Sequence, residues 1–186
     1  STWDSIFNLN PKVTNHYEFY QEDIRLIKNL GVNAYRFSLE WSRIQPSENY
    51  WNKDVIKHYQ KIIELLKENN ITAILTIHHF THPVWFITKY PWHTKKSIEK
   101  FLEYAERLIE NIKGVDYWIT FNEPYLLVLG GYVEGCIPPG YRDFKLAMKA
   151  LRNIFICHGK LYDLIHLENK DSMVSIAHNM AVFAPW

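Results

Sequence analysis

The sequence predicts an α/β fold, an incomplete (β/α)8 TIM barrel of about four βα units. Segments with helical apolar spacing alternate with segments of strand composition, in the order α, β, α, β, α, β, α, β. Strands separated by helices form parallel sheets through right-handed crossovers, and units of about 40 residues suit a barrel with long loops. No GxGxxG follows a strand, which argues against a dinucleotide-binding sheet. We expect a single domain over residues 1–186, too short to close a barrel.

Four helices are predicted from apolar residues that recur on one side. Asn15 followed by Glu18 resembles a capping box before the first helix. Thr94 is the candidate N-cap of the third helix, and Gly114 is its candidate stop. The predicted helices cover about 16–29, about 53–68, the apolar stripe from Ile98 to Ile112, and about 144–168.

Four strands are predicted between these helices from their β-branched and aromatic content. The segment ITAILTI scarcely alternates between apolar and polar residues, which is typical of a strand buried on both faces. The predicted strands are VNAYRFS (32–38), ITAILTI (71–77), VDYWITF (115–121) and MVSIAHNM (173–180).

Polar side chains stand where each strand ends. In parallel α/β folds the chemistry gathers beyond the carboxyl ends of the strands. Buried polar groups cost on the order of a few kcal/mol when unpaired, so their presence there calls for a function or a partner. These residues are Arg36, Ser38 and Glu40; His78 and His79; Asn122 and Glu123; and His178 and Asn179.

Glu123 stands directly after the third predicted strand. Two interpretations follow from position alone: a carboxyl group that gives a proton to a leaving group, or one half of a structural ion pair. The residue before a proline is disfavoured in the helical region, and Pro124 follows. Glu123 is therefore predicted to be extended at the strand tip.

The strand ends together resemble glycoside hydrolase family 1. TFNEP follows the third strand, with HHF one βα unit earlier and YRFS two units earlier, and STWD, EWSRIQP and GYVEGCIPPG are similar to further stretches of the family. The resemblance covers nearly all of the chain, from behind the family's first barrel strand to about the end of its fifth. It implies a retaining β-glycosidase acting on terminal β-linked sugars, without metal or organic cofactor.

The resemblance also implies roles for four residues. Glu123 would be the general acid and base, and Asn122 would bond the 2-hydroxyl of the sugar next to the cleaved bond. His79 matches the histidine that binds sugar hydroxyls. Arg36 matches the arginine that holds the nucleophile ionised.

The family's nucleophile has no counterpart in this sequence. A retaining glycosidase needs a second carboxylate about 5 to 5.5 Å from the first, and the family places it on the seventh strand in an ENG setting. Here EN is followed by Tyr, Asn, Ile or Lys. Glu40 is expected to be a loop carboxylate rather than a substitute. The chain is accordingly interpreted as part of an enzyme, inactive alone.

Two other functions stay open. One is a non-catalytic sugar-binding or structural module that retains His79, Asn122 and Glu123. The other is a metal-dependent hydrolase using His78, His79 and His82, although HHFTH lacks the HExxH pattern and a nearby acidic ligand. Loop tryptophans either stack on sugars or pack in the core: Trp41, Trp85 and Trp92.

Composition limits the partners and the compartment. The net charge of +1 gives no reason to expect nucleic acid or an anionic membrane. No apolar stretch approaches the roughly 18 residues of a spanning helix, and no signal-peptide pattern opens the chain. Cys136 and Cys157 are too few and too far apart in sequence to indicate a disulfide framework, which fits a cytoplasmic protein, and both are predicted to be small packed residues. The expected partners are a carbohydrate substrate and either the missing remainder of the barrel or another chain, because open sheet edges invite pairing.

Overall fold

A computed structural model describes residues 14–180. Four parallel strands form one sheet in the order β1-β2-β3-β4. Neighbouring strands follow one another along the chain, as expected for successive βα units. The strands are β1 (Ala34–Ser38), β2 (Thr72–His78), β3 (Tyr117–Asn122) and β4 (Met173–Ala177).

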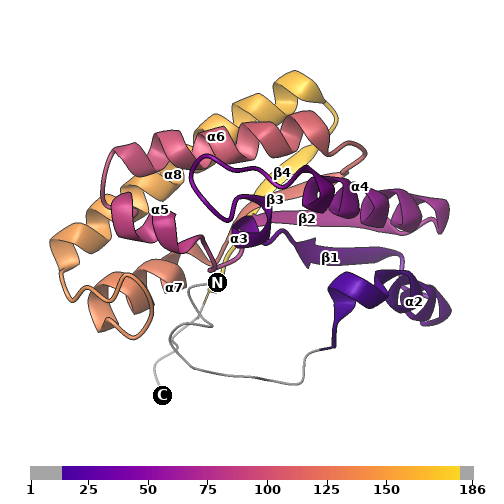
Figure 1. Ribbon diagram of the computed structural model, residues 1–186, viewed down its shortest axis with the longest axis horizontal. Coiled ribbons are helices and arrows are strands. Elements are labelled where there is room, and N and C mark those ends of the chain that lie inside the picture. Colours follow the sequence, from indigo (N-terminus) through magenta and orange to yellow (C-terminus); the bar gives the residue numbers. More distant parts are fainter. Residues whose placement is uncertain (1–13, 181–186) are drawn as a thin grey trace, which may run out of the picture.

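Long helices cover one face of this sheet, and shorter ones follow the strands. Figure 1 shows α4, α6 and α8 side by side above the sheet, with α2 beside β1. The sheet and its crossover helices form a partial (β/α) barrel. The helical elements are α2 (His16–Asn29), α3 (Trp41–Ile44), α4 (Lys53–Glu68), α5 (Val84–Lys89), α6 (Lys96–Asn111), α7 (Pro124–Val128), the π-helical η1 (Leu129–Glu134) and α8 (Phe144–Glu168).

The core between sheet and helices is rich in aromatic rings. Trp41 and Trp92 are 1% and 0% exposed. The Trp41 ring lies 4.5 Å from the ring centroids of Phe86 and Tyr104, and Trp92 lies 5.0 Å from Phe86 and 5.2 Å from Phe101. Trp41 and Trp92 are therefore core residues that anchor the loops behind β1 and β2.

The predicted alternation of helices and strands is confirmed, but two predicted helix caps are wrong. Asn15 has a left-handed backbone (φ 52°) and its side chain makes no cap bond, because a capping side chain needs an extended backbone. Helix α6 begins at Lys96 without a side-chain cap. Thr94 instead offers its backbone carbonyl to the Ser97 hydroxyl at 2.7 Å.

Three predictions about other segments have different outcomes. The stretch STWD lies outside the described residues. Cys157 is buried as predicted, with burial raising the pKa of its thiol to about 12, whereas Cys136 is exposed, which contradicts its prediction as a packed residue. Within residues 14–180, no helix has both the length and the apolar character needed to cross a bilayer.

Candidate active site

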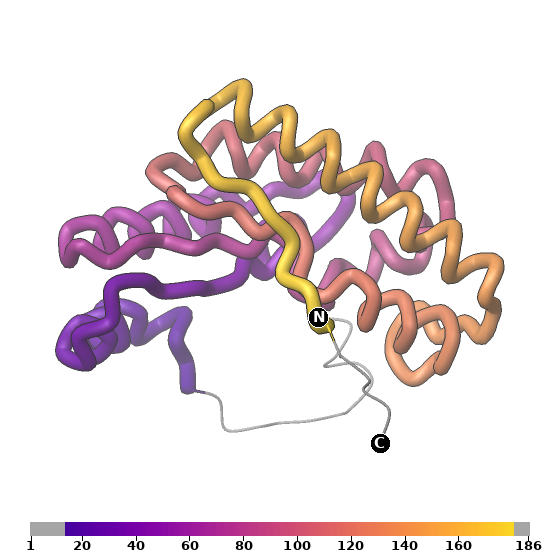
Figure 2. Tube along the Cα trace, turned by 180° about the vertical axis from the view of Figure 1, so that it is seen from behind, coloured from indigo at the N-terminus to yellow at the C-terminus, as the bar shows by residue number. Residues whose placement is uncertain are grey.

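The carboxyl ends of β1, β2 and β3 bring the polar strand-tip residues to one edge of the sheet. Figure 2, which shows the molecule from behind, displays the four strands converging at these ends. Arg36 pairs with Ile74 and Ser38 pairs with Thr76 in the β1–β2 register. His78 pairs with Phe121 in the β2–β3 register. Side chains that are 40 to 86 residues apart in sequence therefore become neighbours.

Arg36 joins all three strands through its guanidinium group. Its Nε donates to Thr76 Oγ1 at 3.0 Å, and its Nη2 donates to Asn122 Oδ1 at 2.6 Å. Asn122 is 6% exposed and Thr76 is fully buried. Because the guanidinium occupies the amide oxygen, the amide NH2 of Asn122 is the group that remains to donate to a ligand.

His79 is held by a second bond across the β1–β2 boundary. Its Nδ1 lies 2.7 Å from Ser38 Oγ. Burial lowers the pKa of His79 and the Arg36 charge lowers it further, while the Glu123 carboxylate opposes both. The imidazole is thus neutral at neutral pH, with Nε2 as its second polar atom. The charges of Arg36 and Glu123 are thus both close enough to the His79 ring to change its pKa.

Glu123 is half-buried at the end of β3, but the prediction of an extended backbone is wrong. It has φ 44° and ψ 58°, in the left-handed region. Its N–H donates to Ala177 O at 2.7 Å and its carbonyl accepts from Leu127 N–H at 3.1 Å. A proline disfavours the right-handed helical region at the preceding residue. The left-handed conformation meets that restriction while turning the chain from β3 into α7.

Glu40 is a carboxylate that bonds groups of the loops, as predicted. One carboxylate oxygen accepts from the N–H of Ser42 at 3.1 Å and from the Ser42 hydroxyl, which caps α3. The other accepts from Thr81 Oγ1 at 2.8 Å. Both oxygens are therefore engaged by groups of the loops after β1 and β2.

The histidines proposed as zinc ligands do not converge. The rings of His78 and His82 stack with centroids 5.7 Å apart, both 1% exposed, whereas His79 faces Ser38. Among residues 14–180, no three His, Cys, Asp or Glu side chains gather in a way that would hold a metal ion. Burial lowers the pKa of His82 to about 4 and that of His78 well below its usual range.

The remaining candidates lie at the margin of the site. His178 and Asn179 follow β4 and are exposed. Trp85 is half-buried, and its Nε1 donates to the Gln45 carbonyl at 3.0 Å. Trp85 therefore ties α5 to the loop after α3.

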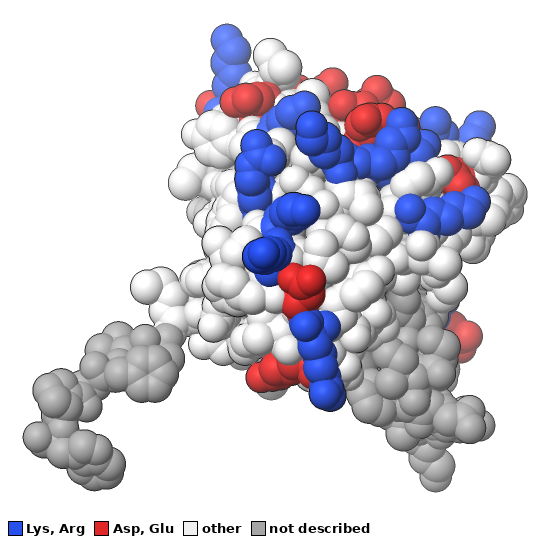
Figure 3. All heavy atoms as spheres, turned by 90° about the vertical axis from the view of Figure 1, so that its left-hand side faces the viewer, with Lys and Arg blue, Asp and Glu red and all other residues white. Residues whose placement is uncertain are grey.

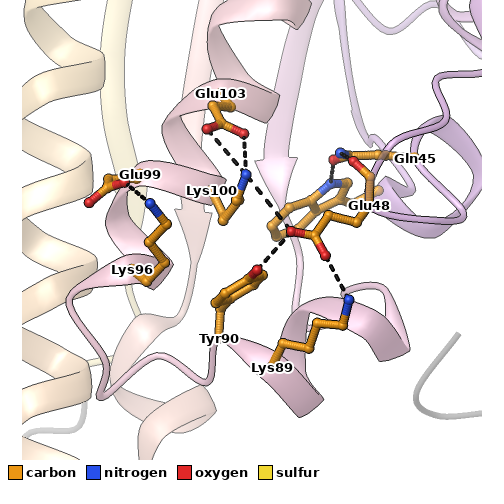
Figure 4. A network of polar contacts seen from close by, with 9 residues as sticks. Gln45, Glu48, Lys89, Tyr90, Lys96, Glu99, Lys100 and Glu103 are labelled. Atoms are coloured by element: carbon orange, nitrogen blue, oxygen red, sulfur yellow. Dashed lines mark hydrogen bonds and ion pairs between the residues drawn. The ribbon is translucent and has the colours of Figure 1, made fainter.

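Sequence reasoning missed a polar network that braces the same loops. In Figure 4 the Glu48 carboxylate accepts from Lys89 at 2.8 Å and from Tyr90 OH at 2.7 Å, with Lys100 Nζ 3.9 Å away. The Lys89 and Tyr90 hydrogen bonds lower the pKa of Glu48. Gln45 donates to the Glu48 carbonyl at 2.8 Å. No local pattern points to Glu48, because its partners lie 41 and 42 residues away.

A partial barrel with neutral imidazole, amide and carboxylate groups at its strand tips belongs to the class of TIM-barrel proteins that carry their active sites there. The model of glycosyl hydrolase family 1 matches residues 8–186. The chain belongs to that family.

Known relatives agree in sequence and in fold. The chain is 35% identical to beta-glucosidase A of Thermotoga maritima over 173 residues, which cover 92% of this chain and 39% of that protein. The solved family 1 beta-glucosidase from Thermotoga maritima matches with a TM-score of 0.90 and 33% identity, covering 100% of this chain and 44% of that one. The beta-glycosidase from Pyrococcus horikoshii matches with a TM-score of 0.86 and 36% identity, covering 95% of this chain and 42% of that one. The chain thus spans less than half the length of these relatives.

Proposed function

We propose that this chain is the acid/base-bearing part of a retaining β-glycosidase that hydrolyses terminal β-linked glycosides such as β-glucosides. The observation that carries the proposal is the Arg36–Asn122 bond of 2.6 Å, which orients the amide directly beside Glu123. Family membership and the names of the relatives, beta-glucosidase and beta-glycosidase, support the substrate class.

In this proposal the tips of β2 and β3 supply the groups that contact the sugar and transfer the proton. The NH2 group of Asn122 donates to the 2-hydroxyl of the sugar, a contact that strengthens as the oxocarbenium-like transition state forms. Neutral His79 offers Nε2 to another hydroxyl. Glu123 protonates the leaving oxygen and then deprotonates the attacking water, so the same carboxyl group acts as acid and as base.

The nucleophile is proposed to come from outside the described residues. A retaining reaction needs a second carboxylate about 5 to 5.5 Å from Glu123. Glu40 is the other carboxylate that follows one of the described strand tips β1 to β3, and both its oxygens are engaged by Ser42 and Thr81. Arg36 would hold the incoming nucleophile ionised. The expected partners are therefore a carbohydrate and the remainder of the barrel, or another chain that completes it.

Two further proposals concern the setting. Residues 1–186 are proposed to be one incomplete catalytic barrel domain. A cytoplasmic location is proposed because both cysteines are free thiols.

A non-catalytic sugar-binding fragment is the second candidate. It is favoured by the engagement of both Glu40 oxygens, which leaves Glu123 without a described carboxylate partner. In that case His79, Asn122 and Glu123 would bind sugar without turnover.

Hydrolysis of a panel of aryl β-glycosides separates the two candidates. We expect no turnover by the purified chain, and turnover when it is mixed with a chain that supplies the missing strands, taken from the Thermotoga maritima beta-glucosidase. Glu123→Gln in that mixture should abolish turnover, with exposed Glu106→Gln as the matched control. Sugar binding without turnover in the completed barrel would select the binding module instead.

A further inference from the structure

A strained turn follows β2 directly at the sugar-binding candidate His79. The N–H of Thr81 donates to the carbonyl of His79 at 2.8 Å, so the turn closes over only three residues. Its central residue, Phe80, has φ 66°. Such a γ-like turn is rare, and a residue with a side chain adopts this φ only at an energetic cost. Strained conformations persist where the surrounding structure holds them, and they cluster at functional sites.

The surrounding structure that holds this turn comes from the tip of β1. Thr81 Oγ1 donates to Glu40 Oε2 at 2.8 Å, although the two residues are 41 positions apart. Glu40 is itself fixed, since its other oxygen caps α3 through Ser42 and its N–H donates to the hydroxyl of Tyr59 in α4 at 3.1 Å. The Glu40 carboxylate is thus held in place, and it connects the loop after β1 to the loop after β2.

We propose that Glu40 is a positioning residue: through Thr81 it holds the strained turn and so fixes where the His79 imidazole stands. The part played in sugar recognition rests on the function proposed above for His79. Two hydrogen bonds then fix the position of the His79 imidazole. Ser38 Oγ, 2.7 Å from Nδ1, sets the rotation of the ring, and Glu40 sets the backbone that carries it.

Helix capping alone does not account for the hydrogen bonds of the Glu40 carboxylate. A capping side chain uses one acceptor oxygen, and Ser42 occupies that oxygen. The second oxygen reaches a different loop and bonds the residue next to the strained position. The two roles of Glu40 are therefore separable by changing one partner at a time.

Separate substitutions of the two partners test the proposal in the purified chain labelled uniformly with 15N. Thr81→Val removes the hydroxyl and leaves the α3 cap in place. Thr81→Ser restores a hydroxyl, and Ser42→Ala removes a partner from the other oxygen of Glu40. His79→Gln assigns the imidazole signals. The charged and titratable groups that face this ring are Arg36, Glu123 and His78.

The readouts are the titration of the His79 ring and amide exchange at position 81. In Thr81→Val the pKa of His79 is expected to rise toward the unperturbed value of about 6.5, because the ring leaves its buried place beside Arg36. The amide at position 81 should exchange about ten-fold faster. Thr81→Ser and Ser42→Ala should keep the original titration and exchange.

An unchanged titration and exchange rate in Thr81→Val would overturn the proposal, and so would an equal change in Ser42→Ala. Thr81→Ala measured in the same way replaces Thr81→Val if circular dichroism shows that the latter does not fold. Methyl β-D-glucoside added to each sample tests the function separately. If it moves no His79 signal even in the unaltered chain, sugar binding by His79 fails, while the effect of Thr81→Val still decides the positioning role.

Discussion

At the scale of the residue, the type and place of the site groups are predictable, but their partners are not. Glu123, Asn122, His79 and Arg36 stand out because polar residues end strands that are otherwise apolar. Their hydrogen bonds depend on the register of neighbouring strands, which places Ser38 and Thr76 side by side. The left-handed backbone of Glu123 is also unpredictable, since a following proline disfavours the right-handed helical region without choosing among the other regions.

Replacing Arg36 tests the strand-tip network. Arg36→Leu should lower the free energy of unfolding by about 1–3 kcal/mol, because the buried oxygens of Thr76 and Asn122 lose their donor. Urea unfolding measures the change. Thr76→Val, which removes only one of the two bonds, should cost less than Arg36→Leu. An equal cost would show that the Asn122 bond contributes nothing.

At the scale of the element, long periodic segments are predictable and short ones are not. Helix α4 has the predicted bounds of 53–68, because six buried residues repeat along one side. Helices α3, α5 and α7 have only four to six residues, too few to show a periodicity. These short helices follow the strand tips, so the loops that shape the site are the part that sequence patterns leave undefined.

The end of β2 and the loop after it should make the protein sensitive to acid. His78 and His82 are buried and neutral, with pKa values below the unfolded value of about 6.5. Their contribution to stability is complete above pH 6.5, and it is lost as the pH falls toward 4, because the unfolded chain then binds more protons. For His82 the loss is on the order of 3 kcal/mol.

Unfolding in urea at pH 7.0 and pH 4.5 measures this sensitivity. His82→Leu should reduce the difference in unfolding free energy between the two pH values, since one of the buried histidines that take up a proton on unfolding in this range is gone. His166→Gln, which changes a histidine bonded to the Tyr162 carbonyl in the last turns of α8, is the control. If the pH dependence of the unfolding free energy is unchanged in His82→Leu, His82 is not a source of the acid sensitivity.

A single buried amide ties α8 to the segment before α6. Asn153 Nδ2 donates to the carbonyls of Trp92 at 2.8 Å and of Thr94 at 3.0 Å. Asn153→Leu should cost about 1–3 kcal/mol of unfolding free energy, because buried acceptors lose a donor. Exposed Arg152→Leu is the neighbouring control. Equal melting curves for the two variants would contradict this expectation.

At the scale of the whole molecule, stability comes from the aromatic core rather than from surface charge. On the face that Figure 3 shows, Lys and Arg side chains lie interspersed with Asp and Glu. Helical pairs such as Lys57–Asp54, 3.5 Å apart, are solvent-exposed, and exposed pairs contribute little. The core rings link β2 and β3 to α5 and α6, so the described part should unfold as one unit.

Truncation of a core ring tests this cooperativity. Phe101→Ala should lower the unfolding free energy by about 3–5 kcal/mol, seen equally by tryptophan fluorescence and by circular dichroism. Phe155, which is 46% exposed on α8, is the matched site, and Phe155→Ala should change stability by only about 0.5 kcal/mol. Separate transitions for the two probes would contradict a single core.

Azide rescue is the most direct test of Glu123 as the acid and base of a retaining reaction. In the completed barrel, Glu123→Ala is given 2,4-dinitrophenyl β-glucoside, whose leaving group needs no proton, together with sodium azide. We expect azide to restore turnover and to give the β-configured glucosyl azide, because a nucleophile on another strand still forms the glycosyl-enzyme. An α-configured product would make Glu123 the nucleophile, and the absence of rescue would leave Glu123 outside the chemistry.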